Sequence, residues 1–153
     1  ISVLFSFYLL DYVANLQLRM RHYVFVIAIL LAGVMLSPLY FLFGWYDKVL
    51  HLIQPMFLAS IVLYIVTPLN ISSRWKFLFT FFVVVGGLGL FEVGEYLIDV
   101  AFDSKLQGVF RLTGVGLVLV QGRIDDTIVD LLFGVVSTLV YLFGVALFSS
   151  KKH

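Results

Sequence analysis

The segment QGRIDDTIVDLLFGVVST, residues 121–138, decides the fold class because it joins three aspartates to the start of a long apolar run. The run continues to residue 148 without another charged side chain, and a helix needs about 20 apolar residues to cross the hydrocarbon core of a bilayer. We therefore predict a membrane-spanning helix over residues 126–148. Asp125, Asp126 and Asp130 would then lie at its start, near one membrane face.

The composition of the whole chain also indicates a membrane protein. Of its 153 residues, 62% are hydrophobic and 12% are charged, whereas soluble domains carry about 25% charged residues. The net charge of +1 and the lack of a basic patch argue against a nucleic-acid partner. The absence of cysteine excludes disulfides and thiolate metal sites. Because the first residue is Ile1, we expect the natural chain to begin earlier.

Other apolar segments extend this prediction to an all-α, polytopic bundle of about five transmembrane helices, forming a single domain over residues 1–153. The spans are predicted at residues 1–16, 23–43, 47–67, 77–102 and 126–148. Pro38 and Pro55 fall within two of them, which membrane helices tolerate when neighbours satisfy the freed carbonyl. Residues 103–124 contain four glycines and no long apolar run, so we predict a loop that dips partway back into the protein.

Lysines and arginines near the helix ends predict the orientation. Five spans place six basic residues on one side, namely Arg19, Arg21, Arg74, Lys76, Lys151 and Lys152. They place four on the other side, namely Lys48, Lys105, Arg111 and Arg123. We therefore predict a multi-pass protein of the cell membrane whose C-terminus is cytoplasmic.

Most of the acidic residues fall at helix ends that share one membrane face, the outer face in this orientation. They are Asp47, Glu92, Glu95, Asp99, Asp125, Asp126 and Asp130. Spacings of three, four or seven residues put them on one face of each helix, and His51 follows Asp47 by four. A carboxylate at the bilayer centre costs about 2.5–3.5 kcal/mol on insertion scales. The acids should therefore turn inward and share one polar pocket.

A pocket with several carboxylates needs positive charge, because neighbouring carboxylates cannot all stay ionised. Shared protons, the cations Lys48, Arg111 and Arg123, or a bound metal would each meet this need. Carboxylates with one imidazole suit a divalent cation such as Mg²⁺, Mn²⁺, Ca²⁺, Zn²⁺ or iron. The predicted metal ligands are Asp47, His51, Glu92, Glu95, Asp99 and Asp130.

If the pocket is catalytic, its residues can be assigned catalytic and substrate-binding roles. The sequence does not decide whether it is catalytic. The predicted catalytic residues are His51, Asp126 and Asp130, and the predicted substrate-binding residues are Lys48, Gln121 and Arg123. Their chemistry suits an anionic or lipid-linked substrate.

Simpler interpretations stand beside these roles. Asp47 would cap one helix and Asp125 or Asp126 another, since aspartate is a good N-cap. Ion pairs with the nearby basic residues would brace the bundle through Glu92, Glu95 and Asp99. Asp130 lies too far inside its helix for capping to explain it.

Three motifs resemble signatures of the YjdF-like proteins, a bacterial inner-membrane family without an assigned function. They are YDKVLH at residues 46–51, EVGEY at 92–96 and QGRIDDTIVDLL at 121–132. The resemblance implies an intact membrane bundle with a polar site. It carries over to Asp47, Lys48, His51, Glu92, Glu95, Gln121, Asp126, Thr127 and Asp130. The more distant VanZ-like proteins are similar in the Asp-Lys-x-x-His start and in an aspartate near the start of a late helix.

Three functions are compatible with this sequence. The first is a membrane-embedded enzyme in which a metal activates water. The second is a transporter of protons or small solutes, since acids and histidines within the membrane are typical of proton paths. The third is an accessory or structural subunit whose Phe-rich helices contact partner membrane subunits as well as lipid.

Overall fold

The computed structural model describes residues 2–150 and confirms an all-α membrane fold with one small sheet. The chain divides into two compact units, Ile1–Ser37 and Pro38–His153. Residue 1 of the first predicted span lies outside the described residues, as do Lys151 and Lys152, which count in the predicted orientation.

Three helices of the second unit are long and apolar enough to cross a membrane. They are α4 (Tyr46–Val66), α5 (Ser73–Phe102) and α6 (Arg123–Ser150). They correspond to the predicted spans 47–67, 77–102 and 126–148, and α5 and α6 begin three or four residues earlier than predicted. Their apolar composition therefore located the three helices well and their starts less well.

The boundaries of these helices have local causes. The Thr67 hydroxyl donates a 2.6 Å hydrogen bond to the Leu63 carbonyl where α4 ends, and the following Pro68 has no N–H with which to continue the helix. At the end of α5, Asp103 adopts a left-handed conformation with φ 50°, which turns the chain out of the helix. Pro55 lies buried inside α4.

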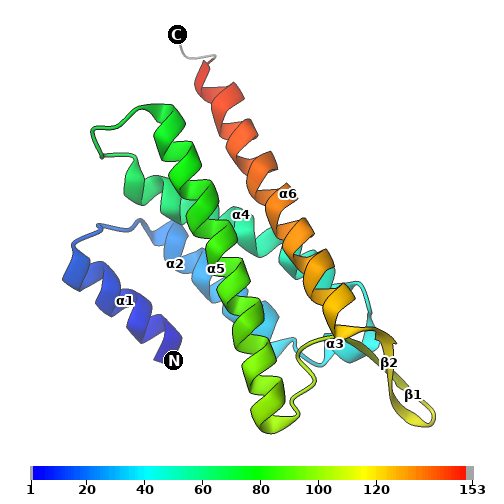
Figure 1. The fold of residues 1–153 in the computed structure, drawn as a ribbon. Coiled ribbons are helices and arrows are strands. Elements are labelled where there is room, and N and C mark those ends of the chain that lie inside the picture. Colours follow the sequence, from blue (N-terminus) through cyan, green and yellow to red (C-terminus); the bar gives the residue numbers. More distant parts are fainter. Residues whose placement is uncertain (1, 151–153) are drawn as a thin grey trace. The chain divides into compact units, whose positions relative to one another are not determined.

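The three long helices pack against one another along an apolar middle section. α4 contacts both α5 and α6, and α5 also contacts α6, as Figure 1 shows. Ala59, Val62 and Val84 form the buried core of this section. Gly134 of α6 leaves room for the Leu88 side chain of α5, because a Cβ atom at Gly134 would lie 2.3 Å from Leu88 Cδ1.

The first unit contains shorter helices than the sequence predicted. α1 covers Ser2–Ala14, α2 covers Met20–Leu30, and a π-helical turn, η1, covers Leu31–Met35. At a rise of about 1.5 Å per residue, α1 is about 20 Å long, short of the roughly 30 Å hydrocarbon core. The predicted span 23–43 is interrupted before Pro38, and a short helix, α3 (Leu39–Leu42), follows in the second unit.

Between α5 and α6 the chain forms a β-hairpin where we predicted a loop. Strand β1 (Val109–Thr113) pairs antiparallel with β2 (Gly116–Gln121). The run of β-branched and apolar residues favours strands, and Gly116, with φ 112°, permits the tight turn. The hairpin lies at the end of the unit where α5 stops and α6 starts (Figure 1).

Candidate functional site

The predicted gathering of polar side chains at one end of the long helices is confirmed by their contacts. α4 supplies residues from its first two turns, α5 from its last three and α6 from its first two. The buried members are His51, Glu92, Asp99, Asp126 and Asp130, each no more than 7% exposed. These helices approach one another at a polar end, although the middle of each helix is apolar.

Lys48 connects α4 to α6 at the centre of this end. Its ammonium lies 3.1 Å from Asp47 Oδ2 and 2.7 Å from Asp130 Oδ1, and it also donates a hydrogen bond to Asp126 Oδ1. The Lys48 side chain is only 14% exposed. Of the three arrangements considered for charge compensation, a local cation is therefore present, and one lysine serves three carboxylates.

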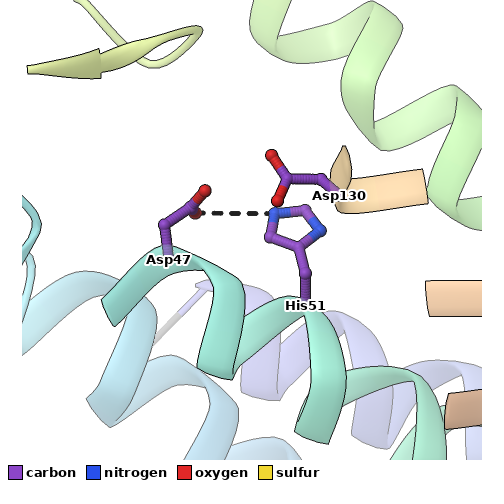
Figure 2. Close-up of side chains that lie close together, drawn as sticks. All are labelled: Asp47, His51 and Asp130. Atoms are coloured by element: carbon purple, nitrogen blue, oxygen red, sulfur yellow. Dashed lines mark ion pairs between the residues drawn. The ribbon is translucent and has the colours of Figure 1, made fainter. Parts of the chain in front are cut away.

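His51 faces carboxylates on both sides of its ring. Its Nε2 lies 3.6 Å from Asp47 Oδ1 on the same helix, and its Nδ1 lies 3.9 Å from Glu92 Oε1 on α5. The Asp130 carboxylate reaches the Asp47 side of the ring from α6 (Figure 2). One ligand atom each from Asp47, His51 and Asp130 lie within 4.8 Å of one another, which is a spacing that could close around a metal ion.

Glu92 is held by a short chain of hydrogen bonds. The Thr127 hydroxyl donates to Glu92 Oε2 at 2.9 Å and accepts from Gln107 Nε2 at 3.1 Å. The other oxygen, Glu92 Oε1, is buried, and within residues 2–150 it has no hydrogen-bond donor. One oxygen is thus fixed, and the other is directed toward His51.

Two aspartates hold the loop that leads into the hairpin. Asp99 accepts hydrogen bonds from the amides of Leu106 at 2.7 Å and Gln107 at 3.0 Å. Asp126 Oδ2 accepts one from the Gly108 amide at 2.8 Å. Because φ is 88° at Gly108, a side chain at this position would be strained. The loop is therefore fastened to α5 and α6 by the polar site itself.

Several predicted residues lie at the margin of this site. Glu95 is half-buried on α5, and Gln121 is half-buried at the end of β2. Arg123 and Asp125 are exposed in the first turn of α6. The predicted roles of Glu95 as a ligand and of Gln121 and Arg123 in substrate binding stay predictions.

Two of the simpler interpretations do not hold. The N-cap of α4 is Trp45, so the interpretation of Asp47 as the cap is wrong. Bracing through ion pairs with nearby basic residues is also wrong for Asp99, which binds backbone amides. Its predicted role as a metal ligand stays a prediction, although both of its oxygens already accept hydrogen bonds.

A second lysine–aspartate pair lies just outside the helices, beyond α5. Lys105 Nζ lies 2.6 Å from Asp103 Oδ1, and the side chain of Asp103 is 75% exposed. The hydrogen bond from Lys105 lowers the pKa of the Asp103 carboxyl. This pair provides an exposed counterpart to the buried contacts of Lys48.

Gln107 is the site residue that the sequence did not reveal. It lies in the loop before β1, is 7% exposed, and joins Glu92, Asp99 and Thr127. No periodicity marks a residue outside a helix as buried, so the sequence pattern held no signal for it. Thr127 was indicated only by the family resemblance.

Comparison with known proteins places the chain in a family. The model of the family described as "Predicted membrane protein (DUF2238)" matches residues 1–151, so the chain belongs to this family. The resemblance to YjdF-like proteins is consistent with this assignment. Neither a curated protein nor a solved structure matches the chain.

Proposed function

We propose that this member of the DUF2238 membrane protein family binds a divalent cation between α4 and α6 and acts as a membrane-embedded enzyme on an anionic or lipid-linked substrate. The observation that carries the proposal is the grouping of Asp47, His51 and Asp130, whose ligand atoms lie within 4.8 Å of one another. Two carboxylates and one imidazole form a donor set that suits Mn²⁺, iron or Zn²⁺.

The fit of this group to a cation can be tested on the distances. Ligand atoms about 2.1 Å from one metal in a tetrahedral site lie about 3.4 Å apart, so the widest separation in this group would have to shrink by up to about 1.4 Å. His51 and Asp130 are buried, and Asp47 is partly exposed, which leaves one side of the group open. The buried Glu92 Oε1 near the His51 ring lacks a hydrogen-bond donor among the described residues, which is a further sign that acceptor oxygens outnumber donors here.

The residues around the cation would divide the work of the site. A bound metal would supply Lewis acidity and lower the pKa of a bound water. Glu92, fixed by Thr127, would orient the His51 ring from the side away from Asp47. Lys48 would contribute positive charge for an anionic group of the substrate, and Asp126 would keep the hairpin loop closed over the site through Gly108.

We place the site at the outer membrane face and the C-terminus in the cytoplasm. Six of the ten basic residues fall on the predicted cytoplasmic side, which the positive-inside rule favours. On the membrane side that holds the polar site, Lys48 and Lys105 are paired with aspartates, which weakens their effect on the orientation of the chain. A fluorescent protein fused to the C-terminus should fold and fluoresce in the cytoplasm. A fusion that does not fluoresce would indicate the opposite orientation.

The metal proposal can be tested on purified protein in nanodiscs. Metal analysis by mass spectrometry should find a divalent ion, and Mn²⁺ titration followed by electron paramagnetic resonance should show one site. Asp47→Asn and His51→Gln should each weaken Mn²⁺ binding at least about tenfold, which corresponds to about 1.4 kcal/mol. Asp103→Asn, which alters the exposed pair, is the matched control. Folded protein that binds no Mn²⁺ would refute the proposal.

A structural role in a larger membrane complex is the second candidate. It is favoured by the way the polar side chains already satisfy one another through Lys48, Thr127 and the loop amides. Native mass spectrometry after mild extraction would show a stable partner if this role holds. A lone protein that binds Mn²⁺ would favour the enzyme.

The transport hypothesis and the likeness to VanZ-like proteins stay predictions. Between the polar end and the opposite ends, residues 52–66, 77–91 and 131–148 of the three spans carry no Asp, Glu, Lys, Arg or His. A proton path would need such groups or ordered water along its length. Proton flux in liposomes is the direct measurement.

A further inference from the structure

Lys48 occupies the carboxylates that the proposed metal would need. Its ammonium lies 3.1 Å from Asp47 and 2.7 Å from Asp130, and both are members of the candidate metal-binding group. A divalent cation bound to these carboxylates and the ammonium would repel each other at this distance. Metal and lysine would therefore compete for the same carboxylates.

The third contact of Lys48 has a different character. Asp126 is not a member of the candidate metal-binding group, and its Oδ2 accepts a hydrogen bond from the backbone of Gly108. Its Oδ1 accepts from Lys48. Asp126 is thus a carboxylate held in place by the loop, and it remains a partner for the lysine if Asp47 and Asp130 turn to a metal.

The charges of this group leave room for both cations. When ionised, Asp47, Asp126 and Asp130 carry three negative charges and Lys48 carries one positive charge, which leaves −2 (−3 + 1). A divalent cation brings the sum to zero, so the lysine does not need to leave the site when the metal enters.

We propose that Lys48 is an exchangeable internal counter-ion: an entering divalent cation replaces its ammonium on Asp47 and Asp130, and the lysine stays on Asp126. This inference rests on the proposed function, because it assigns the regulation of the same site. The four-carbon stem of lysine and its compact charge allow such a shift without movement of the backbone. In the metal-free site Lys48 is bound by three carboxylates, and in the loaded site it would keep only Asp126, so its other N–H groups could contact an anionic substrate.

Two substitutions test this exchange. In Lys48→Met the competitor is removed, so the Kd for Mn²⁺, measured in nanodiscs by electron paramagnetic resonance, should fall at least about tenfold. In Asp126→Asn the alternative partner of the lysine is weakened, so the ammonium stays on Asp47 and Asp130 and the Kd should rise. Lys105→Met, at the exposed pair, should leave the Kd unchanged.

The outcomes distinguish the two proposals. If the unsubstituted protein and all variants bind no Mn²⁺, the metal site itself is refuted. If the unsubstituted protein binds Mn²⁺ but Lys48→Met binds it equally or more weakly, the exchange is refuted and the metal site stands. If Lys48→Met does not fold, Asp126→Asn decides, and an unchanged or lower Kd in that variant overturns the exchange.

Discussion

The polar end and the apolar middle of the three-helix unit are stabilised in different ways. In the middle, Ala59, Val62 and Val84 fit together by shape, and each contact contributes weak dispersion forces. At the polar end, Lys48 and the carboxylates around it are paired by charge. A buried pair is costly to break from one side because the remaining charge has no partner. The end should therefore respond to single substitutions more strongly than the middle.

The largest expected effect is that of Lys48→Met without metal. Removing the ammonium leaves Asp126 and Asp130 buried without their cation, and breaking a buried pair in this way costs about 3–5 kcal/mol. Chemical denaturation in detergent, followed by circular dichroism, measures the loss in the free energy of unfolding. Addition of Mn²⁺ should restore more stability to this variant than to the unsubstituted protein. A loss smaller than that of Gly134→Ala in the apolar middle would contradict the conclusion that the polar end is more sensitive to single substitutions.

A smaller loss is expected at Thr127→Val, which keeps the shape of the side chain and removes its hydroxyl. Glu92 Oε2 loses its donor, and Gln107 Nε2 keeps only the Glu92 carbonyl. A buried polar group left without a partner costs about 1–3 kcal/mol. Thr127→Ser, which retains the hydroxyl, is the control for the same denaturation measurement. Equal losses in the two variants would mean that the methyl group, and not the hydrogen bonds, matters there.

The apolar middle is probed by Gly134→Ala, for which a loss of about 1–2 kcal/mol is expected from overpacking. The new Cβ would meet Leu88 Cδ1 at 2.3 Å, so the leucine side chain must move. Gly144→Ala on the same helix is the matched control, because among the described residues no packing neighbour beyond the adjacent helix backbone lies within 4 Å of a Cβ at that position. The control should be neutral or slightly stabilising, since alanine favours helix over glycine.

The smallest effect is expected at Lys105→Met. The pair of Lys105 with Asp103 has the same chemistry as the contacts of Lys48 but lies exposed, and surface ion pairs contribute little. We expect no measurable change in the unfolding midpoint. A loss comparable to that of Lys48→Met would show that burial is not what separates the two lysines.

The long helices and their shared polar end could be predicted from the sequence for one physical reason. A helix that crosses a membrane needs a long apolar run, so acidic residues within such a run are easily recognised in the sequence. Because α4 and α6 begin where α5 ends, the acids at 47, 92 and 130 had to meet at one end. Hydropathy and the alternation of direction together thus located most of the site.

The remaining features depend on contacts that leave no pattern in the chain. Gln107 is buried because Asp99 holds the loop amides around it. The neighbouring sequence contains no pattern that predicts this burial. The central position of Lys48 among three aspartates follows from side-chain reach and not from helix spacing. The chain leaves α1 at Asn15 and Gln17, which both adopt positive φ, and the interruption before Pro38 lies among residues that are mostly apolar.

The turn of the hairpin offers a place to attach a reporter. Its root is tied to Asp99 and Asp126 through the preceding loop, whereas Val115 at its tip is 92% exposed. Loop tips of this kind commonly accept insertions. A short epitope placed after Gly114 should leave the fold unchanged, and antibody staining of intact cells would then reveal directly which compartment the polar end faces.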